Sequence, residues 1–191
     1  MDDKKLIEKI HNGDLSAIRS LVEENKNLIW HIIITMVGRN RDSEDLFQEV
    51  FLRVFKGIKA FRADARISTW IGSIAHHVCI DYLRKKKKET ASQHDEQDQK
   101  SVPGFAQDKS WKKTENEDLN QIVLATIDKL PADYRTVITL YHLDERSYRE
   151  ITEITGMPEG TVKSYISRGR NLLRETLTAL IPDLTEILDD F

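Results

Sequence analysis

The sequence predicts an all-α protein of two small helical domains joined by a flexible polar linker, the second domain containing a helix-turn-helix. Apolar residues recur at helical spacing almost everywhere outside one polar stretch, and no run alternates as a strand does. Only 4 prolines and 8 glycines occur among the 191 residues. We expect the domains at residues 1–88 and 118–180, the linker at 89–117 and an acidic tail at 181–191.

The composition excludes several classes of protein. The formal net charge is −3, which argues against a protein that coats nucleic acid by bulk electrostatics, although local basic stretches remain at 84–88 and 163–174. The single cysteine, Cys79, excludes an internal disulfide framework and suits a reducing compartment. The apolar run WHIIITMV is too short to span a bilayer, and no charged-then-apolar leader opens the chain. We therefore expect a cytosolic protein.

The sequence predicts two helices before residue 38. A short amphipathic segment at 4–11 stops near Gly13, and Asp14 can cap a long helix that ends at Gly38. Apolar residues cover a broad face of that helix, and we expect Trp30 to lie in the core.

The next helix is expected at 42–61, with Asp42 or Ser43 as its cap and an acidic first turn that complements the helix dipole. A wide apolar face that includes Phe55 should pack on the core. The opposite face places a leucine among hydrogen-bonding side chains, as a helix-docking surface does: Asp45, Gln48, Glu49, Leu52 and Arg53. The same residues also fit a solvated amphipathic face.

A polar loop then leads to Ser68, the expected N-cap of a third helix at 69–86. Ile67, Trp70 and Ile71 begin its apolar stripe. Aromatic, histidine and basic side chains interleave along this helix, which suits a nucleic-acid strand. The polar side chains expected off the stripe are His76, His77, Asp81, Arg84 and Lys85. The His76–His77 pair is a poor metal site, because adjacent side chains on a helix diverge.

From about residue 86 to 117 the periodicity dissolves into a polar stretch that is too long for an ordinary loop, which predicts the linker. Helical periodicity resumes at 118–130, and Pro131 should open another helix at its favoured first position.

The stretch 147–174 predicts a helix-turn-helix. Ser147 and Glu150 have the spacing of a capping box, Gly156 stands where a chain leaves a helix through positive φ, and Pro158 prevents continuation. The second helix buries a stripe that contains Gly169, which in mid-helix costs about 1 kcal/mol relative to alanine. Close packing against the preceding helix would explain it.

The exposed side of this second helix carries cations and short hydroxyls, which fit a major groove. The residues outside or beside the buried stripe are Lys163, Ser164, Ser167, Arg168 and Arg170. They equally fit a charged, solvated helix of an ordinary bundle, and this stretch alone does not separate the two.

Four motifs stand in one order along the chain, split by the polar stretch: DSEDLFQEVFLR, FRADARISTWIGSIAHHVCIDYLRK, LPADYRTVITLY and GMPEGTVKSYISRGR. In this order they resemble the extracytoplasmic-function (ECF) sigma factors of bacterial RNA polymerase, and the likeness spans nearly the whole chain. The resemblance implies a transcription initiation factor that recruits core RNA polymerase, recognises both promoter elements and assists strand opening. It also implies an anti-sigma partner.

The resemblance assigns three sets of residues. Those expected to bind the coiled coil of the largest polymerase subunit are Asp45, Gln48, Glu49, Leu52 and Arg53. Those expected to engage the minus-ten element, where a flipped base of the opened non-template strand can be read, are Arg66, Ser68, Thr69, Trp70, His76, His77, Asp81, Arg84 and Lys85. Those expected at the minus-thirty-five element are Lys163, Ser164, Tyr165, Ser167 and Arg168, with Thr161 and Arg170 on phosphates.

The chain departs from the family pattern at three of these positions. His77 stands where asparagine is frequent, and Tyr165 and Ser167 stand where arginine and histidine or an aromatic residue are common. We expect Tyr165 and Ser167 to shape the promoter preference of this protein, while the departure at His77 concerns the base-capture contact.

Three other functions fit parts of the sequence. A stand-alone helix-turn-helix regulator explains the second domain only, and a purely structural bundle explains the packing only. An enzyme with a dispersed active site lacks support, since no nucleophile–base–orienter constellation and no phosphate-cradling glycine loop is visible. We expect no catalysis, cofactor or metal.

Overall fold

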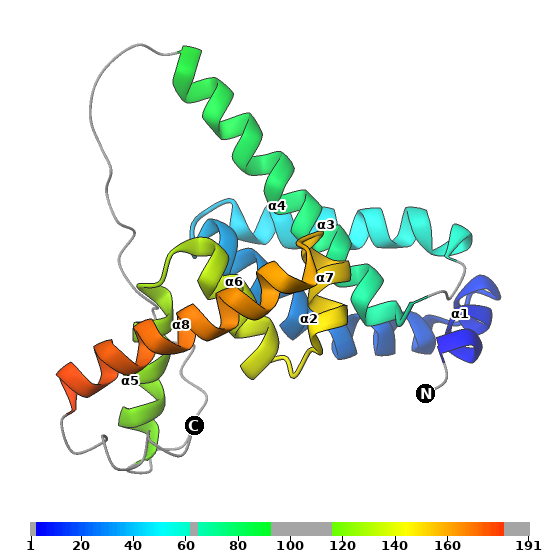
Figure 1. Cartoon of the computed structure of the whole chain (residues 1–191). Helices are drawn as coiled ribbons and strands as arrows, with labels where there is room; N and C mark the ends of the chain where they lie inside the picture. Colours follow the sequence, from blue (N-terminus) through cyan, green and yellow to red (C-terminus); the bar gives the residue numbers. More distant parts are fainter. Residues whose placement is uncertain (1–2, 62–64, 93–115, 182–191) are drawn as a thin grey trace.

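The computed structural model describes residues 3–61, 65–92 and 116–181, and every regular element in these ranges is helical (Figure 1). The elements are α1 (Asp3–His11), α2 (Leu15–Val37), α3 (Ser43–Gly57), the 3-10 turn η1 (Ile58–Ala60), α4 (Ile67–Ser92), α5 (Asn116–Asp128), α6 (Ala132–His142), α7 (Tyr148–Thr155) and α8 (Glu159–Leu180). The prediction of an all-α fold with two helical parts is confirmed. Most of the expected linker, and the tail after residue 181, lie outside the described residues.

Helix α2 runs through the centre of the molecule. As predicted, Asp14 caps its start: the carboxylate accepts hydrogen bonds from the amides of Ser16 (2.8 Å) and Ala17 (3.3 Å). Gly38 ends it at φ 81°. Most of its last three turns is buried, including Leu28, Ile29, Ile32, Ile33, Ile34 and Thr35. A helix that is apolar on most of its circumference needs neighbours on more than one side.

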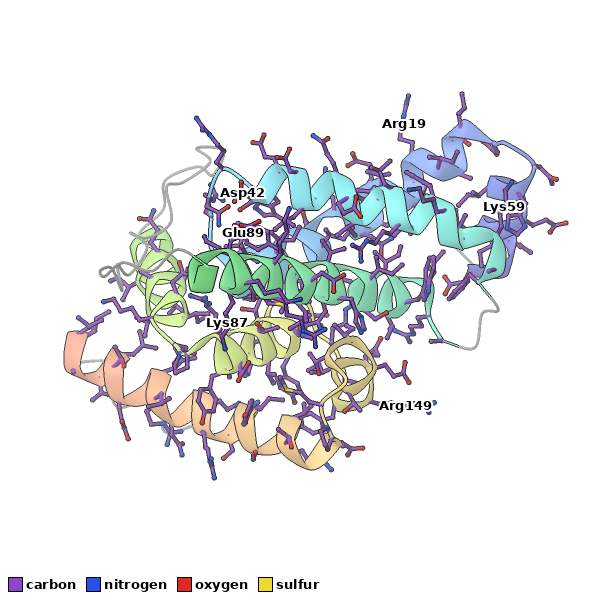
Figure 2. The ribbon with its side chains drawn as sticks, turned by 90° about the horizontal axis from the view of Figure 1, so that it is seen from above. Arg19, Asp42, Lys59, Lys87, Glu89 and Arg149 are labelled. Carbon is purple, nitrogen blue, oxygen red and sulfur yellow. The ribbon has the colours of Figure 1, made fainter. Side chains whose placement is uncertain are left out.

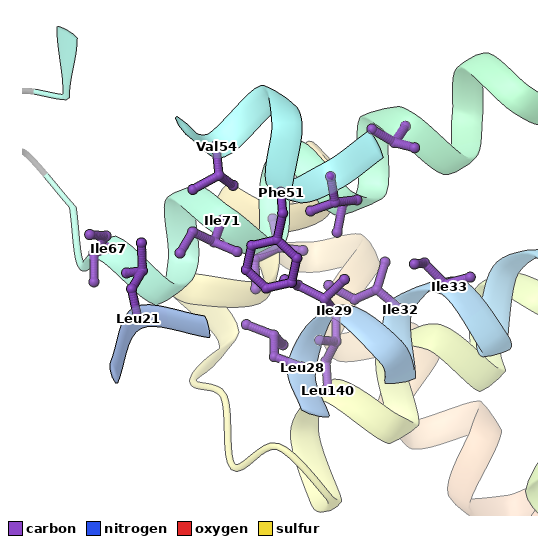
Figure 3. Close-up of a cluster of buried hydrophobic side chains, with 14 of the residues drawn as sticks. Leu21, Leu28, Ile29, Ile32, Ile33, Phe51, Val54, Ile67, Ile71 and Leu140 are labelled. Atoms are coloured by element: carbon purple, nitrogen blue, oxygen red, sulfur yellow. The ribbon is translucent and has the colours of Figure 1, made fainter. Parts of the chain in front are cut away.

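The helices of the first part cover one side of α2. Val50 and Val54 of α3 and Ile71 of α4 are fully buried against it (Figure 3). Phe55 was expected to join this packing but is 37% exposed and stacks on Phe51, with 6.1 Å between ring centroids. The apolar face of α3 is therefore narrower than its sequence suggests.

The predicted cap of α3 is confirmed in position only, and the predicted cap of α4 is wrong. Asp42 stands at the N-cap of α3, but its side chain makes no capping bond; its carboxylate instead accepts a hydrogen bond of 2.6 Å from the Tyr82 hydroxyl of α4. Helix α4 begins at Ile67, so Ser68 lies inside it and is not its N-cap. The carboxylate of Asp3 accepts a hydrogen bond of 2.8 Å from the Ile67 amide at the start of the helix. Asp3, which is 64 positions away in the sequence, thus accepts a hydrogen bond from the first turn of α4, the capping role expected of Ser68.

The second part contains the predicted helix-turn-helix, α7 and α8. The capping box between Ser147 and Glu150 is confirmed, and Gly156 ends α7 in the left-handed region at φ 73°. Pro131 precedes α6 and stands at its N-cap, one residue before the expected place.

Gly169 of α8 is buried because α6 passes close to it. A Cβ atom at Gly169 would lie 2.7 Å from Cγ1 and 3.1 Å from Cδ1 of Ile138. The predicted close packing is present, and its partner is α6.

The two parts are packed together. Val137 and Leu140 of α6, together with Ile151 and Ile154 of α7, belong to the same buried cluster as the residues of α2, α3 and α4. A smaller cluster forms where Ile127 of α5 and Leu130, two residues after that helix, meet α6 and α8. The side of α2 that α3 and α4 leave open is covered by α6.

We expect the substitution Gly169→Ala to destabilise the protein by about 1 kcal/mol. The gain in helix propensity of about 1 kcal/mol is outweighed by an overpacking cost of about 1–3 kcal/mol, since Ile138 is itself buried. The free energy of unfolding in urea measures the change. Gly160→Ala in the same helix is the control, because no atom lies within 4 Å of a Cβ there. Equal stability of both variants would contradict the packing argument.

Candidate nucleic-acid and polymerase interfaces

Helix α8 presents its predicted DNA-contacting side to solvent. Lys163, Ser167, Arg168 and Arg170 are exposed, while the buried stripe of Val162, Ile166 and Gly169 faces inward. Thr161, Ser164 and Tyr165 are half-buried at the border between the two sides. The cations therefore stand where an approaching nucleic acid would meet them.

Local contacts hold two of these cations in place. The ammonium of Lys163 lies 2.6 Å from the Glu159 carboxylate, which raises the pKa of Lys163, and 5.7 Å from the centre of the Tyr148 ring. The guanidinium of Arg170 lies 5.3 Å from the centre of the Tyr141 ring, and its Nε donates to Nε2 of His142 at 3.1 Å. Aromatic faces from α6 and α7 thus orient the charges of α8.

Two members of the predicted minus-thirty-five set are engaged within the protein. The Tyr165 ring packs on Tyr134 of α6, with 4.8 Å between centroids. The Ser164 hydroxyl donates to the Thr161 carbonyl at 2.9 Å. Tyr165 therefore links α8 to α6.

The predicted minus-ten residues at the start of α4 are divided between two environments. Thr69 is 2% exposed and His76 is 8% exposed, so the expectation that His76 lies off the buried stripe is wrong. Trp70 is half-buried, with its ring 4.9 Å from that of Phe61. His77 is exposed, and its Nδ1 donates to the Ser73 carbonyl at 2.6 Å.

Two more residues of this set contact the helix-turn-helix. Arg146, just before α7, donates from Nη1 to the Ser68 hydroxyl at 2.9 Å. Arg66 lies 3.5 Å from the Glu150 carboxylate. The start of the promoter-melting segment predicted from the sequence thus contacts the second part of the chain.

The far end of α4 projects away from the body of the molecule (Figure 1). Its last described turns carry the exposed basic run from Arg84 through Lys85 to Lys88. Lys85 forms a long ion pair with Glu89 at 3.9 Å. This segment presents concentrated positive charge to solvent.

The predicted polymerase-docking face of α3 is exposed. Leu52 is 53% exposed, and Asp45 and Gln48 are also exposed. Arg53 donates to Glu49 at 2.8 Å and to Asp81 of α4 at 3.0 Å, and these carboxylates raise the pKa of its guanidinium. Asp81, predicted as a DNA contact, therefore joins α4 to the docking face.

A groove beside this face was missed because the helical pattern placed Trp30 in the core. Trp30 is half-buried and meets Phe47 edge-on, with 5.8 Å between ring centroids. The residues lining the groove are Lys26, Asn27, Trp30, Glu44, Phe47 and Gln48. The polar residues Lys26 and Asn27, one turn before Trp30, indicate in the sequence that this side of α2 is exposed to solvent.

In the ranges that the structure describes, no group of three or more histidine, cysteine or acidic residues is placed to hold a metal ion. No helix there is long and apolar enough to cross a membrane.

Comparison with known proteins assigns both parts of the chain. Residues 21–89 match the family model of sigma-70 region 2, and residues 120–173 match that of sigma-70 region 4. The ECF RNA polymerase sigma factor SigW of Bacillus subtilis is 34% identical over 182 residues, which cover 93% of this chain and 97% of that protein. The protein belongs to the ECF sigma factors.

Other comparisons agree with this membership. The ECF RNA polymerase sigma-E factor of Escherichia coli K12 is 32% identical over 186 residues, which cover 95% of this chain and 97% of that protein. This ECF sigma factor is accordingly a transcription initiation factor that directs RNA polymerase to promoters.

Solved structures share the fold. The sigma factor RpoE of Bartonella quintana, in complex with the anti-sigma factor NepR, aligns with a TM-score of 0.69 at 23% identity over 86% of this chain and 98% of that one. CnrH in complex with the cytosolic domain of CnrY aligns with a TM-score of 0.63 at 19% identity over 93% and 97%.

We expect the ECF sigma factor to lose stability on mild acidification because of His76. Burial, followed by the charge of His77, lowers the pKa of His76 below 6.5, while Asp133 opposes the shift. Below pH 6.5 the unfolded chain therefore binds a proton that the folded protein resists, so the free energy of unfolding falls as the pH drops.

Urea unfolding between about pH 7.5 and about pH 5.5 measures this slope. His76→Gln should flatten it, whereas His77→Gln at the exposed neighbour should not. His142, whose pKa is also lowered, by burial and then by Arg170, leaves a residual slope in both variants. An unchanged slope in His76→Gln would contradict the assignment.

Proposed function

We propose that this sigma factor binds the promoter and core polymerase through three separate surfaces. The single observation that carries the proposal is the joint presence of solvent-facing cations on α8, a basic α4 and an exposed leucine-centred face on α3. Each surface has a chemistry suited to a different partner. Three weak attachments in one chain together give strong, specific binding.

The first surface reads the minus-thirty-five element. Lys163, Ser167 and Arg168 enter the major groove, where guanidinium and ammonium groups bind guanine edges. Thr161 and Arg170 bind phosphates and set the position of the helix. The contact of Tyr165 with Tyr134 supports a role in fixing the angle of α8 as well as in sequence preference.

The second surface engages the minus-ten element. Arg84 and Lys85 attract the phosphate backbone, and His77 lies on the exposed side of α4, where it can meet a base of the opened strand. Arg66, Ser68, Thr69, Trp70 and His76 complete this surface.

The third surface docks on core polymerase. Leu52 supplies an apolar anchor, and Asp45, Gln48 and Glu49 supply hydrogen-bond acceptors around it. Arg53 holds Glu49 in place and links this face to Asp81 of α4. Polymerase binding is thereby coupled mechanically to the DNA-binding helix.

The proposal includes the setting in which the protein works. It acts by binding energy, without catalysis or a cofactor, in the cytoplasm where polymerase and chromosomal DNA meet. By analogy with the sigma–anti-sigma pairs of similar fold, an anti-sigma protein holds it inactive. The alternative, a stand-alone helix-turn-helix regulator, leaves the α3 face without a role.

The substitution Leu52→Asp should weaken binding to core polymerase by tenfold or more, about 1.4 kcal/mol, because a charge would replace the apolar anchor. Titration of fluorescent protein with core enzyme measures the affinity. Leu15→Asp is the matched control, since Leu15 is also exposed, at 78%, and lies at the start of α2. Equal affinities of both variants would favour the stand-alone regulator.

The substitution Arg168→Ala should lower promoter-specific run-off transcription about tenfold, the cost of one good base contact. Binding to core polymerase should be unchanged, because α8 and α3 are separate surfaces. The promoter is first identified by run-off transcription from a genomic library with core enzyme. Wild-type transcription by Arg168→Ala would remove α8 from promoter reading.

A further inference from the structure

A pair of stacked tyrosines lies against two exposed cations of α8. The rings of Tyr141 of α6 and Tyr148 of α7 have 5.2 Å between their centroids and 11° between their planes. The Lys163 ammonium lies 5.7 Å from the centre of the Tyr148 ring, and the Arg170 guanidinium lies 5.3 Å from the centre of the Tyr141 ring. One aromatic stack from α6 and α7 therefore joins two cations of the helix that is proposed to read DNA.

The spacing of the two cations matters for this contact. Lys163 and Arg170 are seven positions apart, which places them on one side of α8, two turns and about 10 Å apart along its axis. Long charged side chains on a helix surface sample many rotamers, and fixing them when DNA binds costs entropy. Rings that hold the side chains beforehand lower that cost.

Each cation has a second contact that fixes its position on its ring. Lys163 pairs with Glu159, one turn before it, at 2.6 Å. Arg170 donates from Nε to Nε2 of His142 at 3.1 Å, and the His142 ring meets Tyr141 edge-on, with 4.9 Å between centroids. Burial, followed by the charge of Arg170, lowers the pKa of His142, which favours the neutral imidazole that can accept this hydrogen bond.

The stack lies at the edge of the core rather than in it. Ile151, Ile154 and Val162 are fully buried in the main apolar cluster, whereas Tyr141 and Tyr148 are half-buried and pack against that cluster from outside. A hydrogen bond between the two tyrosine side chains raises the pKa of Tyr148. The two rings thus form one unit between the core and the charges of α8.

We propose that Tyr141 and Tyr148 are positioning residues for promoter reading, which hold Lys163 and Arg170 as a coupled pair. The inference rests on the proposed role of α8, in which Lys163 meets base edges and Arg170 meets phosphates. The stack then sets the spacing between a base contact and a backbone contact. A phosphate bound at Arg170 favours the position in which Lys163 reads a base, and loss of either ring weakens both contacts.

Binding of the complete holoenzyme to DNA measures this role. Full-length protein and core polymerase are titrated, in the cold before strand opening, against the promoter found by run-off transcription and against unrelated duplex of equal length. Tyr141→Leu and Tyr148→Leu should each weaken promoter binding about fivefold. Binding to unrelated DNA should not change, because cations without a fixed position still attract phosphates. Tyr141→Phe and Tyr148→Phe keep the rings and should bind as the wild type does.

Double-mutant cycles separate positioning from packing. Tyr148→Leu should cause little further loss of promoter affinity in the Lys163→Ala variant, and Tyr141→Leu little further loss in Arg170→Ala. If the tyrosines only support the fold, each leucine substitution costs the same factor in every background. That result would overturn the positioning role.

Arg149 provides the matched control for these cycles. It follows Tyr148 directly in α7, projects from the surface of the molecule (Figure 2) and pairs with Glu153 at 3.0 Å rather than with the stack. The effects of Arg149→Ala and Tyr148→Leu should therefore multiply without coupling. Coupling as strong as that of Lys163 would show that Tyr148 acts on the whole helix-turn-helix, which contradicts the proposal.

Circular dichroism checks that the leucine variants are folded. The cycle between Lys163→Ala and Arg170→Ala needs no tyrosine substitution, and coupling through the stack makes the double variant lose less than the product of the two single losses. Independent losses, or phenylalanine variants as weak as the leucine ones, would overturn the inference. A failure of the proposed function is distinguishable, because Lys163→Ala and Arg170→Ala would then each bind the promoter as the wild type does.

Discussion

The structure depends on one constraint, the need of α2 to be covered on nearly all sides. Its last three turns bury a run of large aliphatic side chains that includes Ile29, Ile32 and Ile33, and no single neighbouring helix can shield them all. Helices α3 and α4 shield one side, and α6 shields another through Val137 and Leu140. The two parts of the chain therefore meet on a shared apolar element, and the positions of all three proposed surfaces follow from that meeting.

Helix α4 has two roles, which fall on different residues. Its inner side, with Ile71 and Ala75, builds the core of the first part. Another part of its surface carries Thr69 and His76, which are buried in the folded chain and belong to the proposed minus-ten set. Gly72 of α4 is also closely packed, because a Cβ atom there would lie 3.0 Å from Ile154 of α7 and 3.5 Å from Leu28 of α2. The basic end beyond Arg84 stands clear of both contacts.

Sequence reasoning succeeded where the determinants are local. The capping box of Ser147 and Glu150, the left-handed Gly156 and the exposed Leu52 all follow from neighbouring residues, and each is confirmed. It failed where distant parts of the chain matter: Asp3 binds the first amide of α4 in place of Ser68, and His76, which lies within the electrostatic range of Asp133 of α6, is buried. The sequence pattern of α4 is compatible with either an exposed or a buried His76, because a polar residue beside an apolar stripe is exposed only when no other part of the chain covers it.

The charge distribution fits a factor that has low nonspecific affinity for DNA as a free protein. The net charge of −3 gives the free chain little general attraction to DNA, so in the proposed function the cations of α8 act through their position. Lys163 is paired with Glu159, and the guanidinium of Arg170 lies over the Tyr141 ring. Both contacts further weaken the nonspecific attraction of these cations to DNA phosphates. When polymerase holds the factor near a promoter, the effective concentration of DNA rises and modest contacts suffice.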